Sequence, residues 1–438
     1  MSDRVISVGL CGFGVVGQGV FNHLQKREKD LGVQLGAKVK VTRIAVRDTS
    51  KKRDYDFDES TLTTDPLSIA RDPEIDVVCE LMGGTGLALD VTMAALEAGK
   101  VVVSANKALI CDHGEALFAA AKKGNGQLLF EASVAGGIPV IKAIKDGLVI
   151  NRFSSIYGIL NGTCNYMLTR MTKEGASYQD ILVQAKKLGY AEADESLDVD
   201  GIDTAHKAVV LAYLAYGRWV PYKDILVQGI SEVTQADISF AKENGYAIKL
   251  LAVIDVAHAS GKLYISILPT LVSKKYVLGS VDGVFNAVSI IGDVVGETVY
   301  IGPGAGRDAT ASAVIADIVD GAKSLVQGGS KFVDPAPQGG DLIELAEPEE
   351  IQSRYYVRLQ VEDKPGVMAE VASLLAKFEV SLASVTQKEV DESADHATLI
   401  MTTHMTTEQA ILDAVKALEE SSNVKGKPFT MPISSFES

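Results

Sequence analysis

The spacing of apolar residues in the first third of the chain alternates between strand and helix periods. Strands are predicted at 5–11, 39–46, 75–81, 101–104 and 128–131. Helical patterns over 87–98 and 115–122 separate most of them. Strands that alternate with helices are typical of a parallel sheet covered on both faces. We therefore expect a doubly wound α/β domain over residues 1–138.

After residue 138 the pattern changes to longer amphipathic strands mixed with helices, which predicts an α+β domain over 139–326. The strands expected there are 153–160, 227–233, 248–256, 263–271 and 287–291. A polar turn at 161–165 opens a helix, and further helices are expected from about residue 202 and over 309–326. Pro, Gly and Glu accumulate between 328 and 351, a composition that breaks regular structure. We expect a linker at 327–353.

A small C-terminal module is predicted over 354–433. Alternation at 356–361 indicates a half-buried strand, and a turn at 363–367 leads into a helix that ends near residue 378. The elements expected next are strands at 380–390 and 398–403 and a helix at 408–418. With a last strand, the order is β-α-β-β-α-β.

The first strand runs directly into a glycine-rich turn. Gly12-Phe-Gly-Val-Val-Gly17 lies between a strand and a helix, the context in which G-x-G-x-x-G binds a dinucleotide. Gly12 permits the turn, Gly14 lets the backbone approach a pyrophosphate, and Gly17 lets helix and strand pack closely. The helix N-terminus offers N–H groups to the phosphates. We therefore expect a Rossmann-type sheet with cofactor contacts at Gly12, Phe13, Gly14, Val15, Val16 and Gly17.

The end of the second strand bears on the choice between NAD and NADP. Arg47 is the residue type that accommodates the additional phosphate of NADP, whereas Asp48 beside it is the type that holds the ribose hydroxyls of NAD. More basic residues follow, and a solvated basic loop is the alternative interpretation. We predict that NADP(H) is preferred and that NAD(H) is the second option, with Arg47 in contact with the cofactor.

An acidic segment precedes a lysine in the middle of the chain. Six carboxylates lie between Glu192 and Asp203, and Lys207 follows one helical turn later. On a helix that begins near Gly201, Asp203 and Lys207 share one face. A helix cap would explain Asp203 but not the acidic residues upstream of it.

Two lysines are candidate proton carriers. Lys107 follows a strand end, and Lys207 follows the acidic segment. If two lysines converge on one pocket, their mutual repulsion lowers their pKa values toward neutrality, which favours proton transfer. The ordinary alternative for each lysine is an ammonium group on the surface. His206 is expected on a different side of the helix, in a packing or surface role.

Composition excludes several classes of protein. The net charge of −15 on 438 residues argues against a general nucleic-acid binder. The four cysteines form no C-x-x-C pair, so their spacing suggests neither a zinc site nor a disulfide framework. We expect no signal peptide, no membrane-spanning segment and no membrane partner, and therefore a cytoplasmic protein.

Several of these segments resemble homoserine dehydrogenases. The matching stretches are 9–17, 103–107, 131–139, 159–166 and 189–207, in that family's order. The resemblance implies NAD(P)H-dependent interconversion of L-aspartate 4-semialdehyde and L-homoserine, in threonine, methionine and isoleucine biosynthesis. It also implies a homodimer or homotetramer, in which residues 139–326 bind substrate, carry catalysis and dimerise. The last helix of that domain would pack back on the first domain.

The resemblance assigns roles residue by residue. Lys207 would be the acid/base, while Lys107 would orient the substrate, stabilise charge and contact the cofactor. The substrate's amino and hydroxyl groups would be held by Glu192, Asp198 and Asp203. Cys164 stands where the family usually has threonine, and Cys79 where it usually has an aliphatic residue.

Further ligand contacts follow from the same resemblance. A monovalent cation, Na⁺ or K⁺, would bind mainly to backbone oxygens of the loop that holds Glu131, Val134, Gly136 and Ile138. Cofactor contacts are also expected at Gly189 and Gly304. The turn around Gly304 precedes a long helix, so we favour a ligand role, although a simple chain reversal would also explain it.

The C-terminal module resembles an ACT domain, a small unit that binds amino acids in biosynthetic enzymes. Asp363-Lys-Pro-Gly-Val-Met368 and the pattern after it carry this resemblance over about 354–433. It implies threonine as effector, bound near the turn at Gly366 where two modules pair. The alternative is a dimerisation domain without a ligand.

Two other functions compete with this interpretation. One is a different NADP-dependent dehydrogenase of a small amino-acid-derived aldehyde or alcohol. The other is a catalytically silent amino-acid sensor. The presence of Lys107, Lys207, Glu192 and Asp203 argues against the sensor, because a sensor does not need that set.

Overall fold

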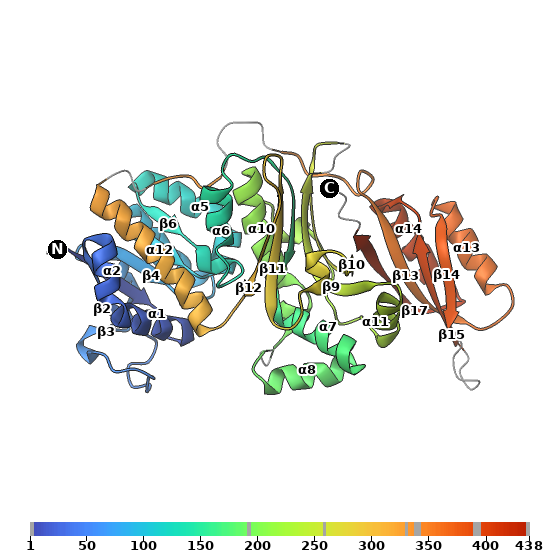
Figure 1. The fold of residues 1–438 in the computed structure, drawn as a ribbon, viewed down its shortest axis with the longest axis horizontal. Coiled ribbons are helices and arrows are strands. Elements are labelled where there is room, and N and C mark those ends of the chain that lie inside the picture. Colours follow the sequence, from blue (N-terminus) through green and yellow to red (C-terminus); the bar gives the residue numbers. More distant parts are fainter. Residues whose placement is uncertain are drawn as a thin grey trace. The chain divides into compact units, whose positions relative to one another are not determined.

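In the computed structural model of the chain, the described residues are 4–190, 194–256, 260–328, 332–336, 343–388 and 396–434. The chain divides into two compact units, each assembled from separate segments, and we describe each by itself (Figure 1). Unit 1 comprises Met1–Phe153, Ala205–Asp224 and Phe285–Leu342. Unit 2 comprises Ser154–Thr204, Ile225–Val284 and Ile343–Ser438.

The core of unit 1 is a parallel sheet with the strand order β3-β2-β1-β4-β5-β6. Its strands are β1 (Val5–Cys11), β2 (Lys38–Ala45), β3 (Leu62–Thr63), β4 (Val77–Glu80), β5 (Val101–Ser104) and β6 (Gln127–Leu129). The residues of β4 and β5 are all buried, as expected for strands covered on both faces. This order reverses between β1 and β4, which creates the crevice where such sheets bind nucleotides.

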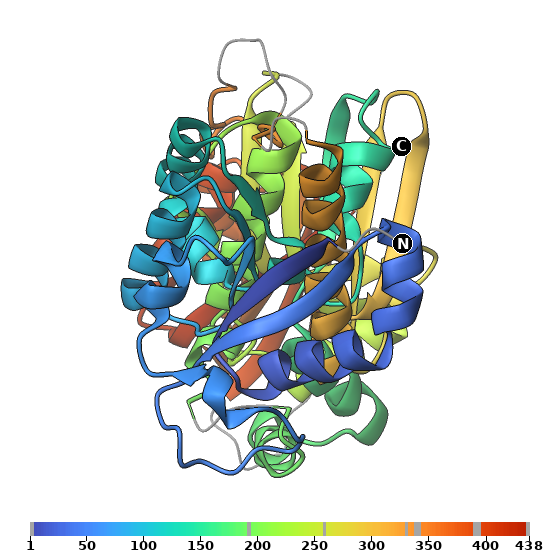
Figure 2. The same cartoon turned by 90° about the vertical axis from the view of Figure 1, so that its left-hand side faces the viewer.

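Helices cover both faces of this sheet (Figure 2). One layer holds α1 (Val15–Lys26), α2 (Glu28–Leu35) and α12 (Arg307–Gln327). The other holds α3 (Pro66–Arg71), α4 (Gly86–Glu97) and α5 (Lys107–Gly124). Helix α12 comes from much later in the chain, and its apolar side packs into the same core as β1 and α1. The Rossmann-type doubly wound sheet predicted from the sequence is confirmed.

Three further elements complete the part of unit 1 that bears on function. Short α6 (Val140–Lys142) follows a 3₁₀ turn at Glu131–Ser133. Strands β11 (Phe285–Gly292) and β12 (Gly296–Pro303) form an antiparallel hairpin that leads into α12. Helix α10 (Ile202–Tyr216) belongs to unit 1 from Ala205 onward.

The sheet of unit 2 runs in the order β7-β9-β10-β17-β13-β15-β14. Its first part consists of β7 (Phe153–Ile159), β9 (Tyr246–Val256) and β10 (Leu263–Ser273), which pair antiparallel. The helices of this part are α7 (Gly162–Glu174), α8 (Tyr178–Lys187), α9 (Ser196–Val199) and α11 (Gln235–Glu243). Helix α7 packs on α8, α11 and β9, so it is the central helix of this part.

The C-terminal module has the predicted β-α-β-β-α-β order. It consists of β13 (Gln352–Glu362), α13 (Val367–Lys377), β14 (Leu382–Lys388), β15 (His396–Thr403), α14 (Glu408–Glu419) and β17 (Val424–Ser434), with the short β16 (Thr406–Thr407) beside β13. Both helices contribute to one apolar core with the sheet, as Figure 1 shows in orange and red.

The module's last strand joins the rest of unit 2. Leu271 and Val272 of β10 pair in parallel with Ile433 and Ser434 of β17. Buried Glu408 of α14 accepts a hydrogen bond of 2.6 Å from the Tyr264 hydroxyl of β10. The module is therefore built into the sheet of unit 2.

A buried carboxylate forms a second connection within unit 2. Asp237 of α11 is fully buried, and its Oδ1 accepts hydrogen bonds from the Tyr356 hydroxyl (2.6 Å) and Arg358 Nε (2.8 Å) of β13. Its Oδ2 accepts from the backbone N–H and hydroxyl of Thr234, which caps α11. Four donors to one buried carboxylate make this connection strong and costly to break.

Two sequence predictions of elements are wrong. Residues 227–233 are not a strand beyond β8 (Leu226–Val227), because the backbone turns to contact α9. Ile230 donates to the Val199 carbonyl, and a Cβ on Gly229 would lie 2.1 Å from the same oxygen. The strand predicted at 128–131 ends at Leu129, because Glu131 belongs to the 3₁₀ turn. Among the described residues, no helix is long and apolar enough to cross a membrane.

Candidate active site

The glycine-rich turn after β1 has the geometry that a dinucleotide requires. Gly12 has a φ of 110°, and a Cβ there would lie 2.5 Å from the Leu81 carbonyl oxygen. A Cβ on Gly17 would lie 2.3 Å from the Gly12 carbonyl oxygen, so α1 packs directly on the turn. Gly14 caps α1, and its Cβ position meets nothing within 4 Å. Two glycines therefore serve the fold, while Gly14 leaves space for a ligand.

A cavity of about 390 Å³ opens at the carboxyl ends of β1, β2 and β4. Its lining is Gly12, Phe13, Gly14, Ala45, Val46, Arg47, Asp48, Lys51, Arg53, Thr64, Pro66, Leu81, Met82, Gly83, Leu87 and Ala88. Of the predicted cofactor contacts, Gly12, Phe13, Gly14 and Arg47 line it, and Val15, Val16 and Gly17 follow as the first turn of α1. The structure therefore brings these predicted residues together.

The loop after β2 distinguishes Arg47 from Asp48. The Asp48 carboxylate accepts hydrogen bonds from the backbone N–H (2.8 Å) and hydroxyl (2.7 Å) of Ser50, which lower its pKa. Arg53 donates to the Asp48 carbonyl and folds the loop back on itself. Arg47 is exposed on the cavity wall. The Asp48 carboxylate is thus bound within its own loop. Arg47, Lys51 and Arg53 give this wall of the cavity a positive charge.

A buried carboxylate that the sequence analysis did not single out organises the ends of β4 and β5. Glu80 is fully buried, and its Oε1 accepts from the backbone N–H of Met82 (2.9 Å) and Gly83 (3.3 Å). Its Oε2 accepts from the Ser104 hydroxyl (2.9 Å). Burial raises the pKa of Glu80, although these hydrogen bonds oppose the shift. The signal in the sequence is a single acid inside an otherwise apolar strand.

The same network positions Lys107. Ser104 Oγ accepts from the Asn106 backbone N–H (3.1 Å), and the Asn106 side chain caps α5 by accepting from Leu109 N–H (3.2 Å). The Asn106 amide also donates to the Gly84 carbonyl (2.7 Å). Lys107 is the first residue of α5 and is half-buried. Lys107 thus lies at the positive end of the helix dipole, where an anionic group is favourable.

Helix α10 carries Lys207, which is buried with 9% of its surface exposed. Within unit 1, the later part of α10 packs on α5: the rings of Phe118 and Tyr213 stack at 5.4 Å, and Trp219 stacks on Tyr213 at 4.1 Å. Gly114 of α5 is close to Trp219, because a Cβ there would lie 2.2 Å from the indole ring. The two helices that carry the candidate lysines are thus fixed to each other by aromatic packing.

In unit 2, one amide side chain gathers two of the predicted carboxylates. The Asn161 Nδ2 donates to Asp198 Oδ1 (2.8 Å) and Asp203 Oδ2 (2.9 Å). Its Oδ1 accepts from the Cys164 N–H (2.8 Å) and caps α7. Asn161 and Asp203 are buried, and Cys164 donates its thiol to the Asp198 carbonyl (3.2 Å). Glu192 lies outside the described residues.

His206 has a packing contact, as predicted: it is buried and meets the Tyr222 ring edge-to-face at 4.6 Å. Gly189 follows α8 with a φ of 74°, and its Cβ position meets nothing within 4 Å. Gly304 is different, because a Cβ there would lie 2.1 Å from the Asn286 side chain. Gly304 therefore has a clear packing reason to be glycine, and its cofactor contact stays a prediction.

The predicted cation loop is a tightly packed turn of unit 1. The Glu131 carboxylate accepts from the N–H groups of Ile141 (2.9 Å) and Lys142 (2.8 Å), so it caps α6. Its own N–H donates to buried Asp317 (2.8 Å). Burial raises the pKa of Glu131 to about 7 and that of Asp317 to about 8.

Backbone oxygens of this loop are the feature that suits a hard cation. Val134 and Gly136 are buried, and a Cβ on Gly136 would lie 2.3 Å from the Gly304 carbonyl oxygen. In the described ranges, no hydrogen bond ends on the carbonyl of Val134 or Gly136, whereas Ile138 accepts from Val140 N–H. Buried carbonyls without a donor are fitting ligands for Na⁺ or K⁺.

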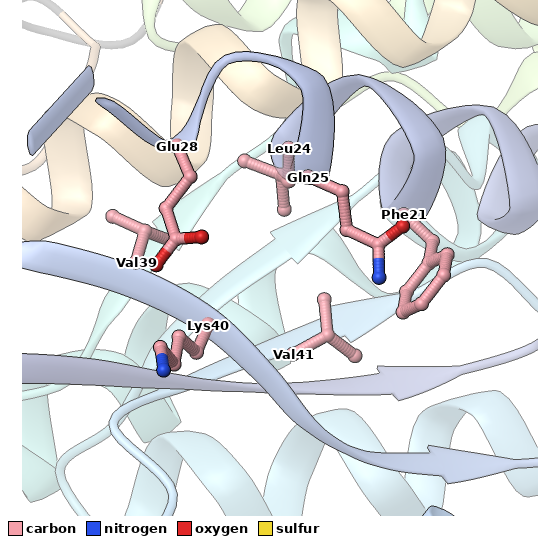
Figure 3. A pocket seen from close by; sticks show the side chains of 7 residues that line it. All are labelled: Phe21, Leu24, Gln25, Glu28, Val39, Lys40 and Val41. Atoms are coloured by element: carbon pink, nitrogen blue, oxygen red, sulfur yellow. The ribbon is translucent and has the colours of Figure 1, made fainter. Parts of the chain in front are cut away.

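A second cavity, of about 220 Å³, lies between α1 and β2 (Figure 3). Its lining residues are Phe21, Leu24, Gln25, Glu28, Val39, Lys40 and Val41. The apolar members belong to the packing seam between helix and strand, and Glu28 and Lys40 have opposite charges at its opening. None of the residues predicted to contact the cofactor lines this cavity.

Family models match almost all parts of this architecture. The homoserine dehydrogenase model matches residues 139–319, the NAD-binding domain of homoserine dehydrogenase matches 12–131, and the ACT domain matches 355–422. The chain is 41% identical over 426 residues to the homoserine dehydrogenase of Pseudomonas aeruginosa, which covers 97% of each protein. It belongs to the homoserine dehydrogenase family. The family is one of oxidoreductases, and the matches confirm the fold class and the ACT module.

Other homoserine dehydrogenases agree with this assignment. The one from Helicobacter pylori is 42% identical, with 97% of each chain covered. The crystal structure of the enzyme from Thiobacillus denitrificans has a TM-score of 0.89 and 37% identity, with 98% of each chain covered. A hyperthermophilic archaeal homoserine dehydrogenase, solved in complex with NADPH, has a TM-score of 0.61 and 26% identity over 73% of this chain and 98% of its own.

Proposed function

We propose that this homoserine dehydrogenase interconverts L-aspartate 4-semialdehyde and L-homoserine with NAD(P)H, as a step toward threonine, methionine and isoleucine. The observation that carries the proposal is that Asn161 binds two carboxylates, Asp198 of α9 and Asp203 in the first turn of the helix that bears Lys207. A substrate with an ammonium group and a hydroxyl needs acidic partners beside a proton carrier.

The nicotinamide, when bound, supplies or accepts the hydride. Asp198 and Asp203, together with Glu192, hold the amino and hydroxyl groups of the substrate. Lys207 moves the proton at the substrate oxygen: it donates to the forming alkoxide in reduction and accepts from the hydroxyl in oxidation. Lys107 orients the substrate and stabilises the charge that develops, from the first turn of α5. Burial of Lys207 excludes water from that proton transfer.

Homoserine oxidation in a lysine variant tests these roles. Purified Lys207→Ala should lose at least a hundredfold of kcat, since positioned acid/base catalysis contributes about 10²–10⁴-fold. The nucleotide Kd should change little. Lys223→Ala, an exposed lysine in the segment after α10, is the matched control and should retain full activity. A folded Lys207→Ala protein with near-normal kcat would exclude Lys207 as the acid/base.

We also propose a preference for NADP over NAD. Arg47 is exposed on the cavity wall and Asp48 is engaged with Ser50, which supports recognition of a phosphate there. Arg47→Ala should reduce kcat/KM with NADP by about tenfold and change the value with NAD much less, since one charge-assisted hydrogen bond contributes about 1.5 kcal/mol. Comparable kcat/KM values for both nucleotides in the unchanged protein would contradict the preference.

A monovalent cation, Na⁺ or K⁺, is proposed at the loop of Glu131, Val134, Gly136 and Ile138. The buried carbonyls described above support it, and the ion would stabilise the turn that carries Glu131. Unfolding temperature should therefore rise with NaCl or KCl more than with an equal ionic strength of tetramethylammonium chloride. Equal shifts with all three salts would contradict a specific site.

Threonine is proposed as the effector of the ACT module, bound near Gly366. Gly366 has a φ of 96° and caps α13, whose first N–H groups can donate hydrogen bonds to a carboxylate. We propose that binding reaches the substrate part of unit 2 through Asp237. Residue Gln235 beside it donates to the carbonyls of Met171 and Ala176 at the end of α7, the helix that Asn161 caps.

Activity and binding must be measured separately to test this regulation. Threonine should reduce the rate of homoserine oxidation and raise the unfolding temperature of the unchanged protein. Tyr356→Phe removes one donor to Asp237, so it should weaken inhibition while the temperature shift persists. A threonine effect on neither quantity would support a module that only dimerises.

We further propose a cytoplasmic homodimer or homotetramer. Light scattering of the purified protein distinguishes the two oligomeric states.

A further inference from the structure

Three side chains with metal-binding atoms converge in unit 1, and none of them has a role in the proposed binding of substrate or cofactor. Cys111 and Asp112 lie on α5, and His206 lies on α10. The thiol sulfur, a carboxylate oxygen and an imidazole nitrogen all lie within 4.8 Å of one another. His206 is buried, Cys111 is half-buried and Asp112 is exposed, so the group opens to solvent at one side.

The donor set is characteristic of a borderline or soft divalent cation. Thiolate and imidazole favour Zn²⁺, Co²⁺ or Cd²⁺ over Mg²⁺ or Ca²⁺, which prefer oxygen ligands. Ligand atoms around tetrahedral Zn²⁺ lie roughly 3.5 Å apart, given metal–ligand bonds of about 2.0–2.3 Å. Small side-chain rotations of roughly 1 Å would bring the three atoms to that spacing. Three protein ligands leave the fourth position to water.

The two helices hold these ligands rigidly. The ring of Phe118 on α5 stacks on Tyr213 of α10, and Gly114 of α5 packs against Trp219 in the segment after α10. Cys111 and Asp112 precede this contact on α5, and His206 precedes it on α10. The ligands therefore come from neighbouring turns of a pre-formed helix pair, which reduces the entropy lost on binding.

We propose that Cys111, Asp112 and His206 form a binding site for one Zn²⁺-class divalent cation per chain. On binding, the thiol proton passes to solvent and the sulfur bonds to the metal as thiolate. Cys111 lies one helical turn after Lys107, and His206 precedes Lys207. Drawing the three ligand atoms together around the ion displaces the lysine-bearing turns of both helices and so inhibits the enzyme; this consequence rests on the roles proposed above for the two lysines.

Spectroscopy tests the binding without recourse to activity. Titration of the full-length protein with Co²⁺ should produce a near-ultraviolet thiolate-to-cobalt charge-transfer band that saturates at one Co²⁺ per chain and is displaced by Zn²⁺. Cys111→Ser should abolish the band, and Asp112→Asn should weaken binding by at least tenfold. Asp90→Asn removes an exposed acid of α4 and is the matched control, which should bind as the unchanged protein does. No band in the unchanged protein, or one that persists in Cys111→Ser, would overturn the site.

Enzyme assays test the consequence. Micromolar Zn²⁺ should inhibit homoserine oxidation reversibly, with recovery on addition of EDTA, and Asp112→Asn should require at least tenfold more Zn²⁺. If Zn²⁺ inhibits Cys111→Ser and Asp112→Asn as strongly as it inhibits the unchanged protein, the link between site and inhibition is overturned. If the chain does not oxidise homoserine at all, the cobalt titration still decides the site, so the two proposals fail independently.

Discussion

Asn106 in unit 1 and Asn161 in unit 2 begin their helices in the same way and do different work. Each amide oxygen accepts from the backbone N–H three residues later, Leu109 in one case and Cys164 in the other. The amide nitrogen of Asn106 then donates to the backbone carbonyl of Gly84, and the side chain also interacts with one carboxylate, that of Glu80. The amide nitrogen of Asn161 donates to two carboxylates, whereas a Ser or Thr cap has one proton to donate and an Asp cap has none.

The difference shows that a helix cap can hold charge as well as terminate a helix. Ser, Thr or Asp would cap either helix nearly as well as Asn. At position 161 these residues would leave Asp198 and Asp203 close together with fewer donors between them. Asn106 should therefore tolerate replacement by Asp, whereas Asn161 should not. The same substitution at two sites makes the comparison testable.

The largest effect is expected for Asn161→Asp. It removes two hydrogen bonds to charged groups, each of about 1.5–3 kcal/mol, and adds a third carboxylate. We expect kcat/KM for homoserine to fall on the order of 10²- to 10⁴-fold, while the Kd for NADP changes little. Steady-state kinetics and a separate nucleotide titration measure the two quantities. A loss of less than tenfold would mean that Asn161 serves mainly as a cap.

Glu80 is the next residue to test. Its carboxylate accepts hydrogen bonds from the loop after β4 and from Ser104 at the end of β5. Its pKa is raised in the folded protein, so the folded state binds the proton more tightly than the unfolded state does. The contribution of Glu80 to stability is therefore fully present below pH 4.5, the ordinary value, and is lost as pH rises through the folded value.

Glu80→Gln removes this titration, so its unfolding free energy should decline less than that of the unchanged protein over the same pH range. The substitution also weakens hydrogen bonds to the loop at Met82 and Gly83 by about 1.5 kcal/mol, which should raise the Kd for NADP about tenfold. Urea unfolding at several pH values measures the first effect. Parallel pH profiles for the two proteins would contradict it.

Asn106→Asp should have a smaller effect than either. The cap is retained, and one donor to the Gly84 carbonyl is lost at a cost of about 1 kcal/mol. The new carboxyl lies beside one acid, Glu80, and not two, and burial raises the pKa of Glu80. We expect a decrease in kcat/KM of about fivefold. Loss comparable to that of Asn161→Asp would show that the amide at 106 also positions a charge, and the contrast between the caps would then disappear.

The smallest effect is expected for Cys164→Thr. A threonine hydroxyl can donate to the Asp198 carbonyl as the thiol does, so the free energy of unfolding should change by about 0.5 kcal/mol or less. Cys164→Val has a similar shape without the donor and should be less stable than Cys164→Thr by about 1 kcal/mol. Equal stability of the two variants would mean that the thiol contact contributes nothing.

Sequence reasoning predicts the elements whose burial pattern is strong. The strands at Val5–Cys11 and Val101–Ser104 have the predicted bounds, since most of their residues are buried and apolar. Helix α10 begins at Ile202 as expected. The strand prediction for the segment after β8 is wrong because Gly229 and Ile230 contact Val199 of α9, which lies far away in the sequence.

For the site, the sequence indicates residue types but not the groups that connect them. The glycine turn, both lysines and the acidic segment are visible because their chemistry is unusual at those spacings. Asn161 and Glu80 are not, because a polar residue before a helix and an acid in a strand have ordinary explanations. Their importance depends on hydrogen bonds to partners 24 to 42 residues away.

The parallel pairing of β17 with β10 has a consequence for synthesis of the chain. During translation, β10 emerges long before β17, and the whole ACT module must follow before the two strands can pair. Until then, β10 lacks its partner at Leu271 and Val272, on the edge that pairs with β8 at Ser266 and Ile267, and unpaired strand edges readily associate with other chains. Nascent protein thus depends on its last strand, and an expression system that stalls late in translation should yield aggregates and not an unregulated enzyme.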